Sequence, residues 1–142
     1  MISIREIDHV VLRVRDMDAM RRFYCGVLGA VHVAWRPEFG MSHLKVGASM
    51  IDLVAVDGPL GKAGGAAPGR EGRNMDHLCL RVEPFDQEAI LAHIARHGVA
   101  VGEIRRRYGA EGNGISIYVT DPEGNTVELK GPSDGQPPPA SP

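Results

Sequence analysis

The sequence lacks any apolar stretch long enough to cross a bilayer. A membrane-spanning helix needs roughly 18 predominantly apolar residues, and no segment of the 142-residue chain comes near that length. The first eight residues also lack the basic-then-apolar order of a secretory signal. We therefore predict a cytoplasmic protein with no membrane partner.

The chain also lacks an excess of positive charge. Its formal net charge is -2 and its estimated pI is about 6.3, whereas binding to a phosphate backbone depends on a broad positive field. We therefore expect no nucleic-acid partner. The hydrophobic share of 43% is typical of one compact domain that buries a core.

Cysteine is scarce, with two residues in the whole chain. Cys25 falls in an expected helix and Cys79 in an expected strand, and no CxxC spacing is present. This pattern does not suit a disulfide framework or a thiolate metal site. We expect both to be buried thiols.

The first half of the chain is expected to form a strand, a helix and three strands. Residues 7–14 are β-branched and apolar, and Asp16 suits the N-cap of a helix that Gly29 would end. Within that helix, apolar residues recur at intervals of three and four positions. The following strands are expected at residues 31–36, 41–46 and 49–56.

The second half repeats this order after a connector at residues 58–72 that is rich in Gly, Ala and Pro. Asp86 suits an N-cap and Gly98 a helix end. Strands are expected at residues 74–82, 99–107, 115–120 and 126–130. We therefore divide a single domain, residues 1–131, into modules 4–57 and 73–131, and we expect a disordered tail at 132–142.

The two halves also match in their letters. HVVLRVRDMDAM from His9 resembles HLCLRVEPFDQEAI from His77, with His, Leu, Arg, Val and an aspartate of the capping region coinciding. A duplication of this size favours two packed modules with any shared site at their junction.

Chemistry-bearing residues occupy equivalent places in the two repeats. Because side chains alternate along a strand, His9 and Arg13 share the face opposite an apolar one, and His77 lies likewise in its repeat. The last strand of each repeat carries an acid, Asp52 or Glu128, between apolar residues. A buried carboxylate is costly unless it is paired or bound to a cation, so two acids and two histidines together indicate a divalent metal site.

The other four histidines lack this repeat relation. We interpret them as surface or pocket-lining residues: His32, His43, His93 and His97.

These motifs resemble those of the glyoxalase, bleomycin-resistance and extradiol dioxygenase superfamily, also called the vicinal oxygen chelate fold. IDHVVLRVRDMDAMRRFYCGVLGA is similar to the opening strand and helix of that superfamily, and YVTDPEGNTVELKGP to its closing turn and strand. The resemblance implies an α+β fold of two β-α-β-β-β modules that form an incomplete eight-stranded barrel around a metal ion. It also implies a homodimer.

The resemblance carries the metal ligands onto His9, Asp52, His77 and Glu128. Glyoxalase I normally has Glu at the place of Asp52, and the shorter aspartate leaves open whether it binds the metal directly. The ligand set suits one divalent ion, Fe, Mn, Ni, Co or Zn, without choosing among them.

The function expected from the resemblance is metal-dependent lyase or isomerase chemistry of the glyoxalase I kind, through an enediolate held by the metal, on a small oxygen-rich substrate. Glu128 would be the catalytic base. Arg13 matches a substrate-contacting arginine of that enzyme, and Tyr118 would line the pocket and donate to a bound oxygen.

Two other functions stay open on the sequence. Extradiol ring cleavage would use iron on His9, His77 and Glu128. A metal-free resistance protein would sequester its ligand intact, although it would need no such ligand set.

Overall fold

The computed structural model describes residues 1–137, which form two compact units. The first unit comprises Met1–Asn74, and the second begins at Met75. Each unit contains one four-stranded sheet. Residues 132–137 follow the last strand without helix or strand, and the rest of the expected tail, residues 138–142, lies outside the described part of the chain.

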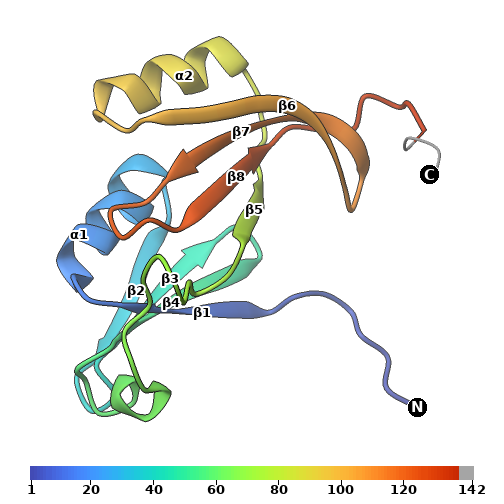
Figure 1. Cartoon of the computed structure of the whole chain (residues 1–142). Coiled ribbons are helices and arrows are strands. Elements are labelled where there is room, and N and C mark those ends of the chain that lie inside the picture. Colours follow the sequence, from blue (N-terminus) through green and yellow to red (C-terminus); the bar gives the residue numbers. More distant parts are fainter. Residues whose placement is uncertain (138–142) are drawn as a thin grey trace. The chain divides into compact units, whose positions relative to one another are not determined.

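The first unit has the order strand, helix, three strands (Figure 1). Its helix begins as α-helix and continues as a π-turn, and a short 3-10 turn follows the last strand. The elements are β1 (His9–Val14), α1 (Met17–Arg21), η1 (Arg22–Val27), β2 (Val31–Arg36), β3 (Met41–Val46), β4 (Ser49–Ala55) and η2 (Gly61–Gly64).

Local chemistry explains where this helix begins and ends. The Asp16 side chain accepts a hydrogen bond of 2.9 Å from the backbone N–H of Ala19, as an N-cap does. Gly29 has a φ of 78°, a left-handed conformation that a residue without Cβ adopts at low cost. Both boundaries are those that the sequence predicts.

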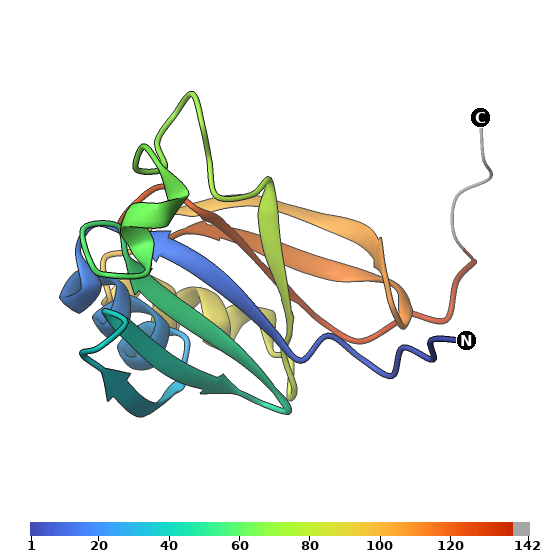
Figure 2. The ribbon, with the colours of Figure 1, turned by 90° about the horizontal axis from the view of Figure 1, so that it is seen from below.

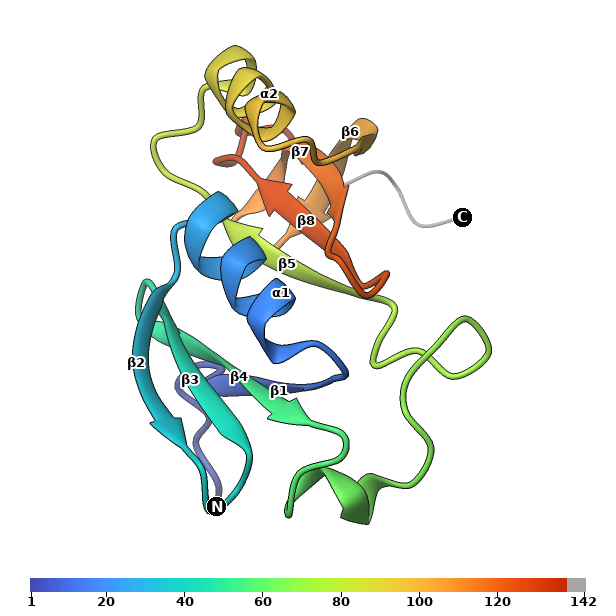
Figure 3. The same ribbon diagram turned by 90° about the vertical axis from the view of Figure 1, so that its left-hand side faces the viewer.

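The sheet of the first unit is mixed, with the strand order β1-β4-β3-β2. Strand β1 runs parallel to β4, and the other two pairs are antiparallel. Helix α1 contacts β4 and lies over one face of this sheet (Figure 3). That face supplies the apolar core, whose fully buried members include Leu12, Val14, Met20, Tyr24, Leu44, Ile51 and Leu53.

The second unit repeats the plan. Its sheet has the order β5-β8-β7-β6, again with one parallel pair, and α2 contacts β6 (Figure 1). The elements are β5 (His77–Arg81), α2 (Gln87–Arg96), β6 (Val101–Gly109), β7 (Gly112–Thr120) and β8 (Thr126–Lys130). The predicted β-α-β-β-β order is therefore confirmed in both units.

A tight polar turn joins β7 to β8. The carboxylate of Asp121 accepts hydrogen bonds from the backbone N–H groups of Glu123 and Asn125, each at 2.9 Å. The side-chain amide of Asn125 donates a third bond to it at 2.7 Å. Gly124 has a φ of 87°. The turn thereby sets the register in which Glu128 on β8 lies beside Tyr118 on β7.

None of the helices in the described range is long and apolar enough to span a bilayer. The expectation of two buried thiols is wrong, because Cys25 is half-buried and Cys79 is exposed. Cys79 alternates with Leu78 and Leu80 on β5 and so shares the polar face with His77 and Arg81.

Candidate functional site

The polar face of the second unit brings His77 and Glu128 together. Glu128 lies beside Cys79 on β5 and beside Tyr118 on β7. Its carboxylate Oε2 is 3.1 Å from Nε2 of His77. The parallel pairing of β5 with β8 therefore brings together a histidine and an acid that are separated by about a third of the chain.

The Glu128 carboxylate is buried but only partly satisfied. The residue is 4% exposed, and within the described residues its Oε1 has no hydrogen-bond partner. A buried charged oxygen without a partner is costly. An imidazole nitrogen and a carboxylate with a spare oxygen are donors that a divalent cation accepts.

The negative charge of Glu128 also affects the neighbouring thiol of Cys79. Although the residue as a whole is exposed, its sulfur is partly desolvated. This desolvation, followed by the charge of the Glu128 carboxylate, raises the pKa of Cys79 to about 11. Its sulfur therefore stays protonated at neutral pH and is a poor nucleophile and metal ligand.

A neighbouring acid holds the His77 ring in place. Nδ1 of His77 donates to the carboxylate of Asp76 at 2.6 Å. This bond leaves Nε2 as the nitrogen facing Glu128. A carboxylate on the distal nitrogen is the usual means of orienting a metal-ligating histidine.

Tyr118 lies in the same cluster. Its ring centroid is 5.6 Å from that of His77, and the guanidinium of Arg107 lies 3.8 Å above the ring. Arg107 in turn donates to the hydroxyl of Ser116 at 2.9 Å. The cation on the ring face and the neighbouring imidazole restrict the positions that Tyr118 can adopt.

His9, the equivalent histidine of the first unit, has an acidic neighbour too. Its Nδ1 donates to the Asp8 carboxylate at 2.6 Å. This hydrogen bond, with a further contribution from the charge of Asp52, raises the pKa of His9 above its usual value. The His9 side chain is 50% exposed.

Asp52 has a partner that the sequence analysis missed. The residue is 6% exposed, and its Oδ1 accepts a hydrogen bond of 2.7 Å from Nδ1 of His43. His43, which the sequence pattern assigns to the surface or to a pocket lining, lies directly opposite Asp52 in the antiparallel pair β3–β4. Counting the residues across the turn at Gly47 would have revealed this pairing.

Arg13 is engaged with the connector instead of being open to a ligand. Its guanidinium donates to the carbonyls of Gly61, Gly65 and Ala66 at 3.0, 2.8 and 2.9 Å. A Cβ on Gly64 would come within 2.5 Å of its Nε and Cζ. Figure 2 shows the connector, in green, turning beside the end of β1. Arg13 thus fixes the connector in the first unit.

The matches to known proteins agree with this architecture. The family model described as the Glyoxalase/Bleomycin resistance protein/Dioxygenase superfamily matches residues 6–129. The chain belongs to this superfamily. The resemblance that the opening and closing motifs indicate is therefore confirmed.

Two curated relatives are similar in sequence to this superfamily member. Virulence protein STM3117 of Salmonella typhimurium is 32% identical over 129 residues, which cover 89% of this chain and 83% of the relative. Glyoxalase domain-containing protein RDO1 of Mycosarcoma maydis is 32% identical over 149 residues, which cover 95% and 73%.

Solved structures share the fold of this chain. The crystal structure of STM3117 has a TM-score of 0.75 at 28% identity, covering 92% of this chain and 99% of that one. A structure from the mobile metagenome of V. Pseudocholerae has a TM-score of 0.75 at 26% identity, with coverages of 94% and 99%.

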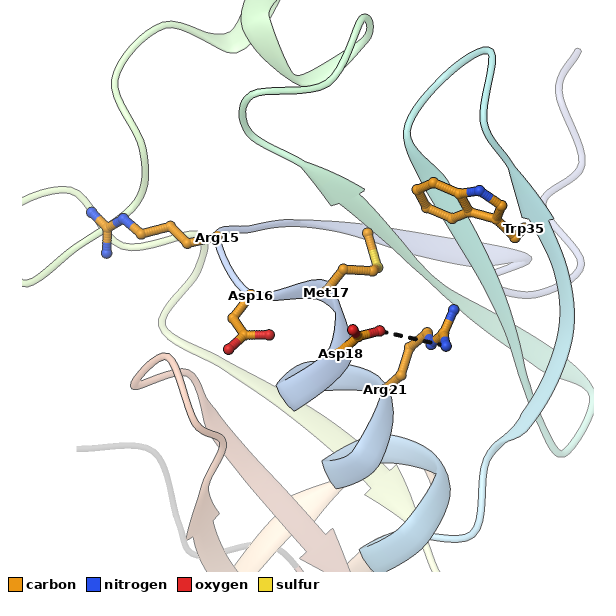
Figure 4. Close-up of a pocket in the computed structure, with 6 residues that line it drawn as sticks. All are labelled: Arg15, Asp16, Met17, Asp18, Arg21 and Trp35. Atoms are coloured by element: carbon orange, nitrogen blue, oxygen red, sulfur yellow. Dashed lines mark ion pairs between the residues drawn. The ribbon is translucent and has the colours of Figure 1, made fainter.

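The first unit of this superfamily member also has two adjoining surface hollows away from the candidate residues. They have volumes of about 550 and 540 Å³ and share Asp18 and Arg21. Figure 4 shows the first, between α1 and Trp35 of β2. Trp35 pairs with Ser42, on the sheet face opposite that of His43 and Asp52. None of the predicted site residues lines either hollow.

The side chains that could bind a metal ion therefore occur as pairs. In residues 1–137 no group of three or more His, Cys, Asp or Glu side chains is gathered so as to hold a metal ion. The pairs are His77 with Glu128 in the second unit and His43 with Asp52 in the first, while His9 is paired with Asp8.

Proposed function

We propose that this superfamily member is a metal-dependent lyase or isomerase acting on a small oxygen-rich molecule. The proposed ligands of a single divalent ion, Fe, Mn, Ni, Co or Zn, are His9, Asp52, His77 and Glu128. In this proposal, the modules form the incomplete eight-stranded barrel expected of the superfamily.

One observation carries this proposal. Glu128 is held beside His77 at 3.1 Å with a buried oxygen that no described residue satisfies. A protein retains such a costly group where it serves a function. A divalent cation would satisfy that oxygen and draw on the neutral imidazole nitrogen of His77 as well.

The metal would polarise the carbonyl group of a substrate that binds through two adjacent oxygens. Glu128 would remove the proton from the carbon next to that carbonyl, because a carboxylate beside the metal would also lie beside the bound substrate. Tyr118, 5.6 Å from His77 between ring centroids, would donate its hydroxyl hydrogen to a substrate oxygen.

His43 gives Asp52 a defined orientation in this scheme. The 2.7 Å hydrogen bond occupies Oδ1, so Oδ2 would be the atom that reaches the metal or a water bound to it. The exchange of Glu for the shorter Asp at this position makes Asp52 the weaker of the two acidic ligands.

Arg13 remains a candidate for substrate binding only if it leaves its present partners. Its three hydrogen bonds to the connector make a positioning role the better proposal. In that role, it would hold residues 61–66 of the connector against the end of the strand that carries His9.

Elemental analysis of protein purified without a metal-binding tag tests the proposal first. We expect about one equivalent of a divalent metal, lost on Glu128→Ala or His77→Ala and retained on the matched change Glu38→Ala at an exposed position. Assays with methylglyoxal–thiol adducts should then show isomerisation. Absence of metal, with tight binding of an intact ligand, would replace the proposal by ligand sequestration.

The same assays separate ring cleavage from isomerisation. Iron-dependent oxygen uptake with catechols, and no turnover of thiol adducts, would favour extradiol chemistry at the same ligands. A homodimer is part of the proposal by similarity to the superfamily, and light scattering at several protein concentrations would measure it.

A further inference from the structure

A lysine that makes no direct ion pair lies in the sheet of the second unit, and the charge it carries contributes to lowering the pKa of Asp134. Lys130, the last residue of β8, is only 5% exposed. In the described part of the chain, no carboxylate forms an ion pair with its ammonium group. Enclosing a lysine side chain in a sheet without a direct ion pair is costly, so its retention calls for an explanation.

The other basic side chains of this sheet all have acidic partners. Arg81 pairs with Glu111 at 2.6 Å, and Arg105 and Arg107 pair with Glu103 at 3.0 and 3.2 Å. Arg106 pairs with Asp134. Lys130 differs from all four arginines in being buried and in making no direct ion pair with a described residue.

Two glycines make room for the Lys130 side chain. A Cβ on Gly109 would lie 2.8 Å from its Cε, and a Cβ on Gly114 would lie 3.1 Å from its Nζ. Both distances are shorter than an ordinary contact. The β6–β7 hairpin therefore keeps an open cradle along the lysine, which holds its ammonium group in a defined place.

Lys130 shares a sheet face with Glu128. The two residues are separated by one position on β8, so their side chains point the same way and their backbones are about 6.6 Å apart. Cys79, which lies beside Glu128, is influenced by the charges of both residues. A ligand of a few bonds' length can reach from one to the other.

We propose that Lys130 binds an oxyanion, a carboxylate or phosphate, at the far end of the substrate. This inference rests on the proposed function for the other end, where two adjacent oxygens would meet the metal. The substrate class is thereby narrowed to small oxygen-rich molecules with a second, negatively charged terminus.

Two acids of equal chain length test the substrate class. 2-Hydroxyglutarate and 2-hydroxyvalerate share the adjacent oxygens, but only the first has a terminal carboxylate. With Mn-loaded protein in a calorimeter, we expect 2-hydroxyglutarate to bind about 10-fold more tightly, as a charged hydrogen bond provides. Lys130→Met should remove that preference and leave 2-hydroxyvalerate binding unchanged, whereas the exposed control Lys45→Met should leave both acids unchanged.

A second measurement needs no metal. Inorganic phosphate, titrated into the wild-type protein, should shift the NMR signal of the Lys130 Cε group in a saturable manner, with the signal assigned by its loss in Lys130→Met. A preference that survives Lys130→Met, or equal binding of the two acids, would overturn the inference.

The calorimetric and NMR experiments also distinguish failure of the proposed function from failure of the oxyanion site at Lys130. If the protein binds neither metal nor hydroxy acid, the proposed function fails, and the phosphate titration then decides the oxyanion site alone. A saturable shift would support that site, and an unchanged Lys130 signal would refute it.

Discussion

The two units place an acid at the same point of the same sheet, yet they satisfy it differently. In the first unit, Asp52 has His43 opposite it and forms a 2.7 Å hydrogen bond with that residue. In the second, Tyr118 stands in the place of His43, and Glu128 contacts His77 while one of its oxygens stays unsatisfied.

This difference follows from the side chains and not from the backbone. Both acids pair with the same positions of their neighbouring strands, Val11 in one unit and Cys79 in the other. A histidine opposite the acid supplies a proton donor at once. In the second unit, Tyr118 lies beneath Arg107 and has no hydrogen bond to Glu128 among the described residues, so Glu128 contacts His77 instead. The first unit thus gives Asp52 a histidine partner within its own sheet, His43, whereas the second leaves Oε1 of Glu128 without a partner among the described residues.

Removing the charge of the open acid is expected to have the largest effect. Glu128→Gln should reduce metal affinity and the proposed activity by more than about 100-fold. The metal-free variant should nevertheless melt at the same or a higher temperature, because a costly buried charge has gone. Calorimetric melting and metal titration measure the two effects, and a lower melting temperature with intact metal binding would contradict the comparison.

Removing His43, the hydrogen-bond partner of Asp52, should mainly lower the stability of the protein. His43→Ala leaves Asp52 buried without its donor, so we expect the free energy of unfolding to fall by about 1–3 kcal/mol. The control is His32→Ala, an exposed position where a change within about 0.5 kcal/mol is expected. Urea unfolding measures both, and equal losses would show that the His43–Asp52 bond contributes nothing.

The hydrogen bonds from Arg13 to the connector belong to the first unit, and weakening them should have a smaller effect on the protein. Arg13→Lys keeps the charge but loses the planar fork that serves three carbonyls. We expect limited proteolysis between residues 58 and 72 to become about 10-fold faster, as about 1.4 kcal/mol of lost local stability would produce. Arg5→Lys, at the exposed N-terminus, should leave the cleavage rate unchanged.

The smallest expected effect is the pH response of an ion pair in the second unit. The hydrogen bond from Arg106, with one from the Gln136 backbone, lowers the pKa of Asp134 to about 2. A lowered pKa stabilises the fold above the ordinary value of 3.8, and this contribution is lost as the pH falls toward 2. Asp134→Asn should therefore reduce stability slightly at pH 5 and match the wild type near pH 2. A difference independent of pH would be inconsistent with this assignment.

The sequence predicts the fold well because local signals and periodicity agree. Asp16, Asp86, Gly29 and Gly98 mark helix ends where the structure has them. It does not predict the π-turn of η1, since the apolar spacing at residues 22–27 suits an α-helix equally. The start of β7 at Gly112 was also missed, because glycine and asparagine disfavour strands.

The candidate site was predicted in part for the same kind of reason. Repeat positions single out His9, His77, Asp52 and Glu128, and the structure pairs the last with His77. Cross-strand partners such as His43 depend on register, which a search for repeated letters does not examine. The engagement of Arg13 with the connector is a long-range contact that no local pattern encodes.

The hold of the first unit on its connector has a mechanical consequence. Asn74 closes that unit through bonds in both directions with the Arg13 backbone, at 3.2 and 3.0 Å, and His77 already belongs to β5. Residues 75 and 76 alone therefore separate Asn74, the last residue of the first unit, from β5. Since Asp76 orients the His77 ring, a change in the backbone conformation of these two residues would act directly on an imidazole proposed to hold the metal.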